Sequence, residues 1–302
     1  MADGFTDSDV PDQSGRTFVV TGANTGLGYE TARVLAARGA RVMLACRSEE
    51  RARGAMDTIS ASDPDADLTF VALDQGDLAS VHAAAESIAD EPRVDVLVNN
   101  AGIMVPPREL TADGFESQFG VNHLGTFALT AHLLPKLGEH EGSRVVVTSS
   151  LAHRGGRIFF DDIDASSSYR AQQRYQQSKL ANLLFMYELG RRLGSAGSET
   201  IATACHPGLA ETELSRHMPK ALALIAPVLR PFFNSALEGA WPTLMAATSH
   251  DVTGGDYCGP SRRMEMAGPA RKVKPTGMSR DPELAGRLWD LSVEMTGVDP
   301  GI

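Results

Sequence analysis

The sequence is short of cysteine and of long apolar runs. Its three cysteines, Cys46, Cys205 and Cys258, lie far apart without a C-x-x-C pair, which favours neither a disulfide framework nor a zinc site. The eight histidines show no H-x-x-x-H spacing, so we expect no bound metal. The first fifteen residues lack the basic start and apolar stretch of a signal peptide, and no run of about 18 apolar residues occurs. These absences predict a soluble protein of the reducing cytoplasm with no membrane span.

Positive charge is also scarce. The chain has 28 Lys and Arg against 38 Asp and Glu, a formal net charge of −10. Such a charge repels nucleic-acid backbones, so we expect no nucleic-acid partner. With 302 residues, 42% hydrophobic and 22% charged, the chain is long enough to bury a sizeable core and too apolar to be disordered. A folded globular protein is expected.

Short apolar runs alternate with helical patterns along most of the chain. The runs predicted as strands are 16–21, 41–46, 68–73, 94–99, 144–149 and 200–205, and the predicted helices are 29–38, 49–59, 78–88, 112–137 and 171–193. Buried strands alternating with helices are typical of a parallel sheet. No linker or repeat divides the pattern. We predict one α/β domain over 16–302, a Rossmann-type doubly wound sheet of about seven strands, after a flexible acidic N-terminus at 1–15.

A glycine-rich loop, TGANTGLG at 21–28, connects the first predicted strand to the first helix. In such a loop Gly22 permits a tight turn, Gly26 lets backbone approach a pyrophosphate, and Gly28 lets the helix pack close to the strand. The helix N-terminus adds free N–H groups and a partial positive charge. The position after the first strand favours dinucleotide binding over a plain glycine-rich turn.

Further motifs follow this loop in a fixed order. They are Asn99-Asn100-Ala101-Gly102, Asn122, Ser150, Tyr175-Gln176-Gln177-Ser178-Lys179 and His206-Pro207-Gly208. Together with the G-x-x-x-G-x-G spacing of the loop, they make the chain from Arg16 to Ser261 resemble the short-chain dehydrogenase/reductases. The stretches at 44–48, 99–104, 121–125, 148–153 and 178–182 are most similar to the retinol-dehydrogenase-like branch of that family.

Tyr175 and Lys179 stand four residues apart in a predicted helix and therefore share one face. A phenol ordinarily titrates near pH 10, and a neighbouring ammonium favours the ionised form, which suits proton transfer. The resemblance implies that Tyr175 exchanges a proton with the alcohol or carbonyl oxygen and that Lys179 also bonds the nicotinamide ribose. Without the other motifs, an exposed tyrosine beside a solvated lysine would be the better interpretation.

Ser150 ends the fifth predicted strand, at the edge where open α/β sheets bind ligands. Its hydroxyl can orient a substrate oxygen and stabilise charge there. Ser149 offers the same chemistry, but the family pattern favours Ser150. The resemblance also assigns Asn122 to the catalytic set, as support for a water that relays protons from Lys179; alone, it would be interpreted as a buried asparagine bonding its own helix. The segment 153–165 is expected at the pocket rim.

No acid stands at the end of the second predicted strand, where one would bond the ribose hydroxyls of NAD. Arg47 is there instead and offers a charged bidentate partner for a phosphate, so we predict a preference for NADP(H) over NAD(H), although Glu49 and Glu50 follow closely. Asp74 resembles a family residue that touches adenine, and Asn100 is equally well explained by a structural role. The full predicted cofactor set is Gly22, Asn24, Thr25, Gly26, Leu27, Gly28, Arg47, Asp74, Asn100, Ala101, Gly102, Tyr175, Lys179, Pro207, Gly208 and Thr212.

These features predict an oxidoreductase that moves a hydride between NADP(H) and an alcohol or its ketone or aldehyde. The alternative is an NADP(H)-sensing regulator that kept the fold and lost catalysis, which the presence of Ser150, Tyr175 and Lys179 disfavours. A sugar-nucleotide epimerase would have a different loop spacing. A Ser/His hydrolase is excluded because Ser150 lacks a G-x-S-x-G elbow.

Two apolar features remain. The segment 209–233 contains a run at 221–229 among prolines, and we expect it to close as a flap over an apolar substrate. Docking on the protein's own core is the alternative, and a membrane-facing role is a third option that the acidic net charge disfavours. Apolar side chains also wrap around more of the helix 171–193 than one sheet face can bury. Either a second copy of the chain, in a homodimer or higher homo-oligomer, or the flap is expected to cover the excess.

Overall fold

A computed structural model describes residues 4–209 and 234–302. The predicted flap at 209–233, apart from Leu209, therefore lies outside the described residues, as does Thr212. One eight-stranded sheet runs through the described part of the chain, with the order β3-β2-β1-β4-β5-β6-β7-β8. Its strands are β1 Thr17–Thr21, β2 Arg41–Cys46, β3 Leu68–Ala72, β4 Val96–Asn99, β5 Arg144–Thr148, β6 Ile201–Cys205, β7 Tyr257–Arg262 and β8 Ala267–Val273.

The first seven strands run parallel, which confirms the predicted doubly wound sheet. In the register of its centre, Val19 of β1 lies between Met43 of β2 and Leu97 of β4. The sheet has one strand more than expected, because β8 returns antiparallel beside β7. Both β7 and the edge strand β8 contain glycine and proline, residues that sequence patterns associate with turns.

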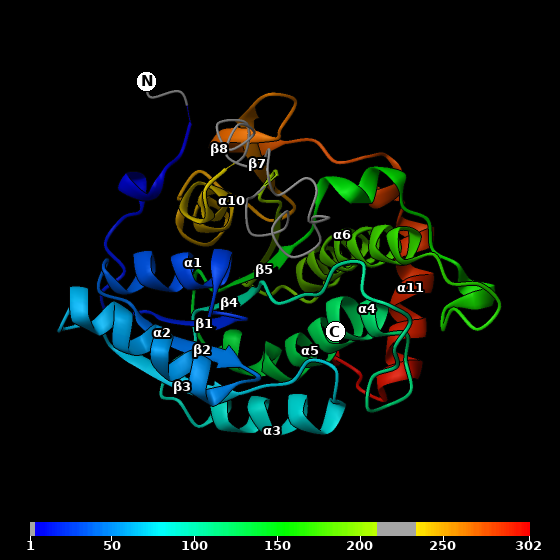
Figure 1. Ribbon diagram of the computed structural model, residues 1–302, viewed down its shortest axis with the longest axis horizontal. Helices are drawn as coiled ribbons and strands as arrows, with labels where there is room; N and C mark the ends of the chain where they lie inside the picture. Colours follow the sequence, from blue (N-terminus) through cyan, green and yellow to red (C-terminus); the bar gives the residue numbers. More distant parts are fainter. Residues whose placement is uncertain (1–3, 210–233) are drawn as a thin grey trace, which may run out of the picture.

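Helices cover both faces of the sheet (Figure 1). They are α1 Gly26–Ala36, α2 Glu49–Ser62, α3 Leu78–Ala89, α4 Ser117–Phe119, α5 Gly125–Leu137, α6 Ala171–Ser195, α10 Ala236–Thr248 and α11 Pro282–Thr296. One apolar core joins the sheet to α1, α2 and α10. A second core joins its other face to α3, α5, α6 and α11. This double burial explains why the strands are apolar on both sides.

The single helix predicted at 112–137 is wrong in two respects. Gly114, at φ +85°, belongs to a turn, and the helix starts only after Glu116, whose carboxylate accepts hydrogen bonds from the N–H groups of Gln118 and Phe119. A π-helical turn at Gly120–Leu124 then separates α4 from α5. A π-helical turn adds one residue and leaves the spacing of apolar residues almost unchanged, so the helical periodicity of the sequence does not reveal the turn.

The N-terminus from Gly4 onward is not the free segment predicted from its polar composition. Phe5 exchanges backbone hydrogen bonds of 2.7 and 2.8 Å with Ala270 of β8. The indole N–H of Trp241 in α10 donates to Asp7 at 2.8 Å, and Val10 is buried in the core. Two apolar side chains and a few hydrogen bonds thus attach the N-terminal segment to β8, α10 and the core, although its composition is that of a flexible tail.

The C-terminal helix α11 covers the surplus apolar face of α6, to the right in Figure 1. The indole of Trp289 lies 6.0 Å from the ring of Phe185 on α6 and 5.2 Å from that of Phe127 on α5, measured between ring centroids. Leu288 packs with Leu184 in the same interface. Within residues 4–209 and 234–302, α11 therefore covers the face of α6 for which the apolar pattern suggested a second copy or the flap.

Candidate active site

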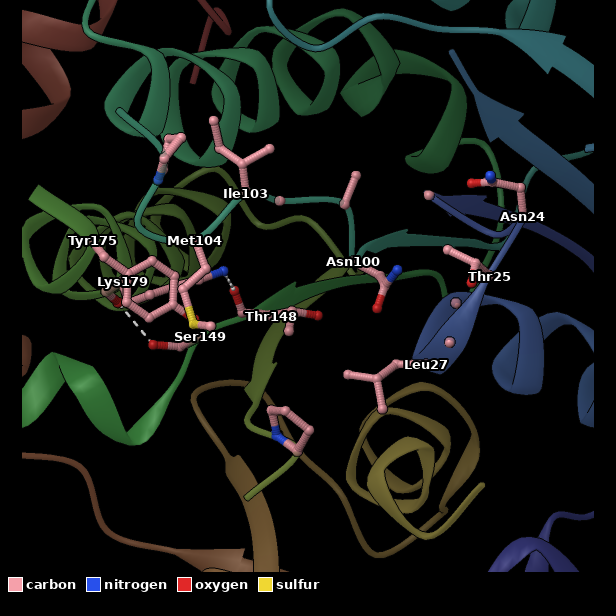
Figure 2. A pocket seen from close by; sticks show the side chains of 17 residues that line it. Asn24, Thr25, Leu27, Asn100, Ile103, Met104, Thr148, Ser149, Tyr175 and Lys179 are labelled. Atoms are coloured by element: carbon pink, nitrogen blue, oxygen red, sulfur yellow. Dashed lines mark hydrogen bonds between the residues drawn. The ribbon is translucent and has the colours of Figure 1, made fainter. Parts of the chain in front are cut away.

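A cavity of about 420 Å³ opens at the carboxyl ends of β1, β4, β5 and β6, where the strand order reverses between β1 and β4. Open α/β sheets bind their ligands at such a point. Twelve predicted site residues line it, namely Gly22, Asn24, Thr25, Gly26, Leu27, Gly28, Asn100, Ala101, Gly102, Tyr175, Lys179 and Pro207, together with Ile103, Met104, Pro106, Thr148 and Ser149. In Figure 2, Tyr175 and Ser149 gather at one end, and Asn24 and Thr25 lie at the other.

The glycine-rich loop brings an uncapped helix N-terminus to this cavity. Thr25 is the N-cap of α1, but its side chain makes no cap hydrogen bond, and the first turn holds no acid. By contrast, Ser48 caps α2 and Asp77 caps α3 through their side-chain oxygens. The first N–H groups of α1 and the positive end of its dipole are therefore available to an anion, which fits the pyrophosphate of a dinucleotide. A Cβ at Gly28 would lie 2.4 Å from the carbonyl oxygen of Gly22, so only glycine fits.

The turn after β4 is tied to the turn after β1. The side-chain amide of Asn100 donates to the carbonyl of Thr21 at 2.8 Å. The Thr21 hydroxyl accepts from the backbone N–H groups of Asn100, at 3.0 Å, and Ala101, at 2.9 Å. Asn100 thus has the structural role considered from the sequence, and it also forms part of the cavity wall.

Tyr175 and Lys179 lie on α6 and face the cavity together (Figure 2), as their spacing predicted. Their exposed fractions are only 4% and 5%. Lys179 Nζ lies 5.8 Å from the centroid of the Tyr175 ring and donates to the carbonyl of Thr148 at 3.3 Å. A phenol and an ammonium are thereby held close together, largely away from water, beside the predicted nucleotide loop.

The two serines after β5 have different surroundings. The hydroxyl of Ser149 lines the cavity and donates to the carbonyl of Lys179 at 2.7 Å. The hydroxyl of Ser150 accepts from the N–H of Ala152 at 3.2 Å, which caps the short helical turn Leu151–Gly155. Ser150 is buried next to the cavity but is not among its lining residues. The role expected of Ser150 therefore stays a prediction, and Ser149, the alternative from the sequence, is the serine that lines the cavity.

Asn122 lies in the π-helical turn and does not bond its own helix. Its amide donates at 2.9 Å to the carbonyl of Ile103 and to the hydroxyl of Ser178, and its carbonyl accepts from the N–H of Ile103 at 2.8 Å. Asn122 therefore connects the cavity wall after β4 to the residue that precedes Lys179 in α6. It does not itself line the cavity.

Arg47 and Asp74 meet outside the cavity, after the ends of β2 and β3. Their Nη1 and Oδ2 atoms lie 3.6 Å apart, and the Arg47 side chain is 73% exposed. Such an exposed pair contributes little stability, so Arg47 can exchange partners at small cost. Nearby, a hollow of about 480 Å³ between α1 and α2 is lined by Arg51 together with Asn24 and Thr25. Arg51 lies in the first turn of α2, beyond the end of β2 where the sequence predicts the phosphate contact.

Neither thiol chemistry nor metal chemistry has support in the described residues. Burial raises the pKa of Cys46 to about 11 and also raises the pKa values of Cys205 and Cys258, so these side chains are thiols and not nucleophilic thiolates. Within residues 4–209 and 234–302, no three His, Cys, Asp or Glu side chains are grouped to hold a metal ion.

In those same ranges, no helix combines the length and apolarity needed to cross a membrane.

Comparisons with known proteins point in the same direction. A sequence model of the family described as short chain dehydrogenase matches residues 16–223. Retinol dehydrogenase 12 of Mus musculus is 42% identical over 287 residues, which cover 94% of this chain and 87% of that protein. A Mycobacterium paratuberculosis structure described as uncharacterized has a TM-score of 0.83 at 41% identity and covers 99% of this chain and 100% of its own.

A solved short chain dehydrogenase from Burkholderia cenocepacia J2315, in complex with NADP, is similar at a TM-score of 0.64 and 25% identity, covering 82% of this chain and 96% of its own. The parallel sheet, the uncapped α1 and the Tyr175–Lys179 pair agree with these likenesses. The chain accordingly belongs to the short-chain dehydrogenase family, in its retinol-dehydrogenase-like branch, and is an oxidoreductase of alcohol and carbonyl groups.

Proposed function

We propose that the protein is an NADP(H)-preferring oxidoreductase that interconverts apolar alcohols with their ketones or aldehydes, with Tyr175 as general acid and base. One observation carries the proposal: the uncapped N-terminus of α1 and the Tyr175–Lys179 pair open into the same cavity. An anion-binding end and a proton-transfer end within one cavity suit a dinucleotide and a substrate lying side by side. The relatives named as retinol dehydrogenases support a substrate of this class.

In this mechanism Tyr175 gives its hydroxyl proton to the carbonyl oxygen during reduction and takes it back during oxidation. The Lys179 ammonium stabilises the phenolate that remains. A serine hydroxyl after β5, from Ser150 or Ser149, orients the substrate oxygen. When bound, the nicotinamide ring supplies or accepts the hydride. Asn122 holds the wall at Ile103 in place beside these groups.

The apolar character of the substrate is inferred from the cavity wall. Ile103, Met104 and Pro106 follow β4 and line the cavity, and Figure 2 labels Ile103 and Met104 among its lining side chains. An apolar wall gains free energy by taking apolar surface out of water. The test measures NADPH oxidation with a long-chain aldehyde, a ring ketone and a three-carbon ketone. NADPH binding without turnover of any carbonyl would instead support the sensing regulator.

The preference for NADP(H) is tested at Arg47. One arginine–phosphate contact is worth about 1.5 to 3 kcal/mol, so kcat/KM should favour NADPH over NADH at least tenfold, and Arg47→Asp should reverse the preference. Arg53→Asp is the control, because Arg53 is exposed on α2 and pairs with Glu49; it should leave the ratio unchanged. Equal kcat/KM for both cofactors in the unmodified protein would contradict the proposal.

A further inference from the structure

One carboxylate lies between the turn that follows β5 and the turn that follows β6. Glu265 stands in the connection between β7 and β8, and its side chain is 17% exposed. Its Oε2 atom lies 2.6 Å from Nη2 of Arg154 and 3.3 Å from Nε2 of His206. Arg154 belongs to the turn Leu151–Gly155 after β5, and His206 directly follows β6. A single side chain therefore contacts both turns.

On the β6 side, His206 connects this carboxylate to the backbone at the cavity. Its imidazole is fully buried, and Nδ1 accepts a hydrogen bond from the N–H of Gly208 at 3.2 Å. An accepting Nδ1 carries no hydrogen, so in the neutral ring the hydrogen is on Nε2, which lies 3.3 Å from Glu265 Oε2 without hydrogen-bond geometry. Burial lowers the pKa of His206, in agreement with a neutral ring. Pro207, between the two bonded residues, lines the cavity.

The same turn lies against the β7–β8 connection along its length. Gly208 has φ +75°, and a Cβ there would lie 2.4 Å from the carbonyl oxygen of Met266. That oxygen accepts from the N–H of Leu209 at 2.9 Å. The side-chain amide of Asn234 donates to the carbonyl of Pro207 at 3.0 Å. The position of Pro207 at the cavity thus depends on the connection that carries Glu265.

On the β5 side, a second buried histidine holds the serine turn. His153 Nδ1 donates to the carbonyl of Ser150 at 2.6 Å, and its Nε2 accepts from the N–H of Thr276 at 3.4 Å. Burial lowers the pKa of His153 to about 4, so this ring is also neutral near pH 7. Arg154, the next residue, extends from this turn to Glu265.

The backbone at Glu265 is unusual for its residue types. Arg263, Met264 and Glu265 have φ values of +53°, +56° and +67°, a left-handed conformation that non-glycine residues seldom adopt. Such conformations persist where the surrounding structure demands them, and they concentrate at functional sites. Here the conformation aims the Glu265 carboxylate at the two turns, while Met264 is 82% exposed.

We propose that Glu265 is a positioning residue for the reaction. Through Arg154 and His206, its carboxylate holds the serine turn and the Pro207 turn at a fixed separation. It touches none of the reacting atoms. The inference rests on the proposed function, because that function assigns the substrate oxygen to the serine turn, and Pro207 lines the same cavity as a member of the predicted cofactor set.

The decisive comparison is Glu265→Gly with Met264→Gly. Both substitutions relieve the left-handed backbone, but only the first removes the carboxylate. For Glu265→Gly we expect kcat and the single-turnover rate of NADPH oxidation to fall at least tenfold, while the Kd for NADPH changes less than threefold. Met264→Gly should stay within twofold of the unmodified protein in each measurement. A purely structural defect would instead lower the unfolding temperature and weaken cofactor binding together.

Two further variants apply if Glu265→Gly fails to fold. Glu265→Gln keeps an acceptor oxygen for His206 and loses the charge that pairs with Arg154, and Arg154→Ala removes the same pair from the other side. Both should lower kcat at least threefold at unchanged Kd for NADPH, and Glu265→Gln should retain more activity than Glu265→Gly wherever both fold.

The outcomes also separate this inference from the proposed function. An active unmodified protein whose folded Glu265→Gly variant, or failing that its Arg154→Ala variant, keeps kcat within twofold would overturn the positioning role alone. An effect confined to the Kd for NADPH would overturn it too. An unmodified protein that turns over none of the carbonyls would remove the proposed function and the positioning role together.

Discussion

In the proposed mechanism, some residues at the cavity transfer the proton and others support that transfer. Tyr175 is the group with an exchangeable proton beside the Lys179 ammonium, and both are almost fully buried. Tyr175→Phe removes that proton with little change in shape, so we expect kcat to fall about 10²-fold or more while NADPH binding stays nearly intact. Lys179→Ala should impair both turnover and binding. Stopped-flow turnover and fluorescence titration measure the two effects.

Tyr187→Phe is a suitable control, since that tyrosine lies on the same helix and does not line the cavity. It should leave kcat within twofold. A Tyr175→Phe variant that retained more than about a tenth of the activity, against the effect expected of a general acid, would show that another group supplies the proton.

At this scale the sequence predicted residues whose chemistry and spacing are local. Tyr175 and Lys179 stand one helical turn apart, and Gly22 to Gly28 form one loop, so their cooperation could be inferred before any fold was known. The contact of Arg154 with Glu265 spans 111 positions. Nothing local indicates such a contact, because it exists only once the strand order places the β7–β8 connection beside the turns after β5 and β6.

Among the elements around the cavity, α1 begins at the glycine-rich loop without a side-chain cap at its N-terminus. Thr25→Asp would place a carboxylate where the first N–H groups of α1 are unsatisfied. A new cap is worth about 1 kcal/mol, so the protein without cofactor should gain about 2 °C in unfolding temperature. The same carboxylate would occupy and repel the phosphate site, and the Kd for NADPH should rise at least tenfold.

Thr25→Ser is the matched control because it keeps a hydroxyl at the cap, and it should change the Kd less than threefold. Thermal unfolding without cofactor and fluorescence titration with NADPH measure the opposing effects. An unchanged Kd in Thr25→Asp, with the expected gain in unfolding temperature, would mean that the helix N-terminus does not face the phosphates.

Element types were predictable where burial and periodicity agree. The six predicted strands are confirmed: five are short β-branched or apolar runs that are almost fully buried, and the edge strand β3 is partly buried. The β7–β8 hairpin was missed because its Gly259, Pro260, Gly268 and Pro269 have the composition of turns, and a sheet edge tolerates them. The π-helical turn that holds Asn122 was missed because it adds one residue without breaking the helical pattern.

At the scale of the whole molecule, α11 covers the apolar face of α6. Because Trp289 and Leu288 cover the face of α6 that suggested a partner, we now expect a monomer near 32.2 kDa by light scattering at micromolar concentration. Trp289→Ala should lower the free energy of unfolding by about 3 to 5 kcal/mol and uncover apolar surface on α5 and α6, so the variant should associate.

The chain's other tryptophan supplies the control for this last prediction. Trp241 lies on α10, on the opposite face of the sheet, where it is partly buried and donates to Asp7. Trp241→Ala should therefore cost less stability than Trp289→Ala and leave the protein monomeric, since α11 still covers α6. A stable dimer of the unmodified protein would contradict the argument, because it would need an apolar surface that the contact of α11 with α6 leaves uncovered.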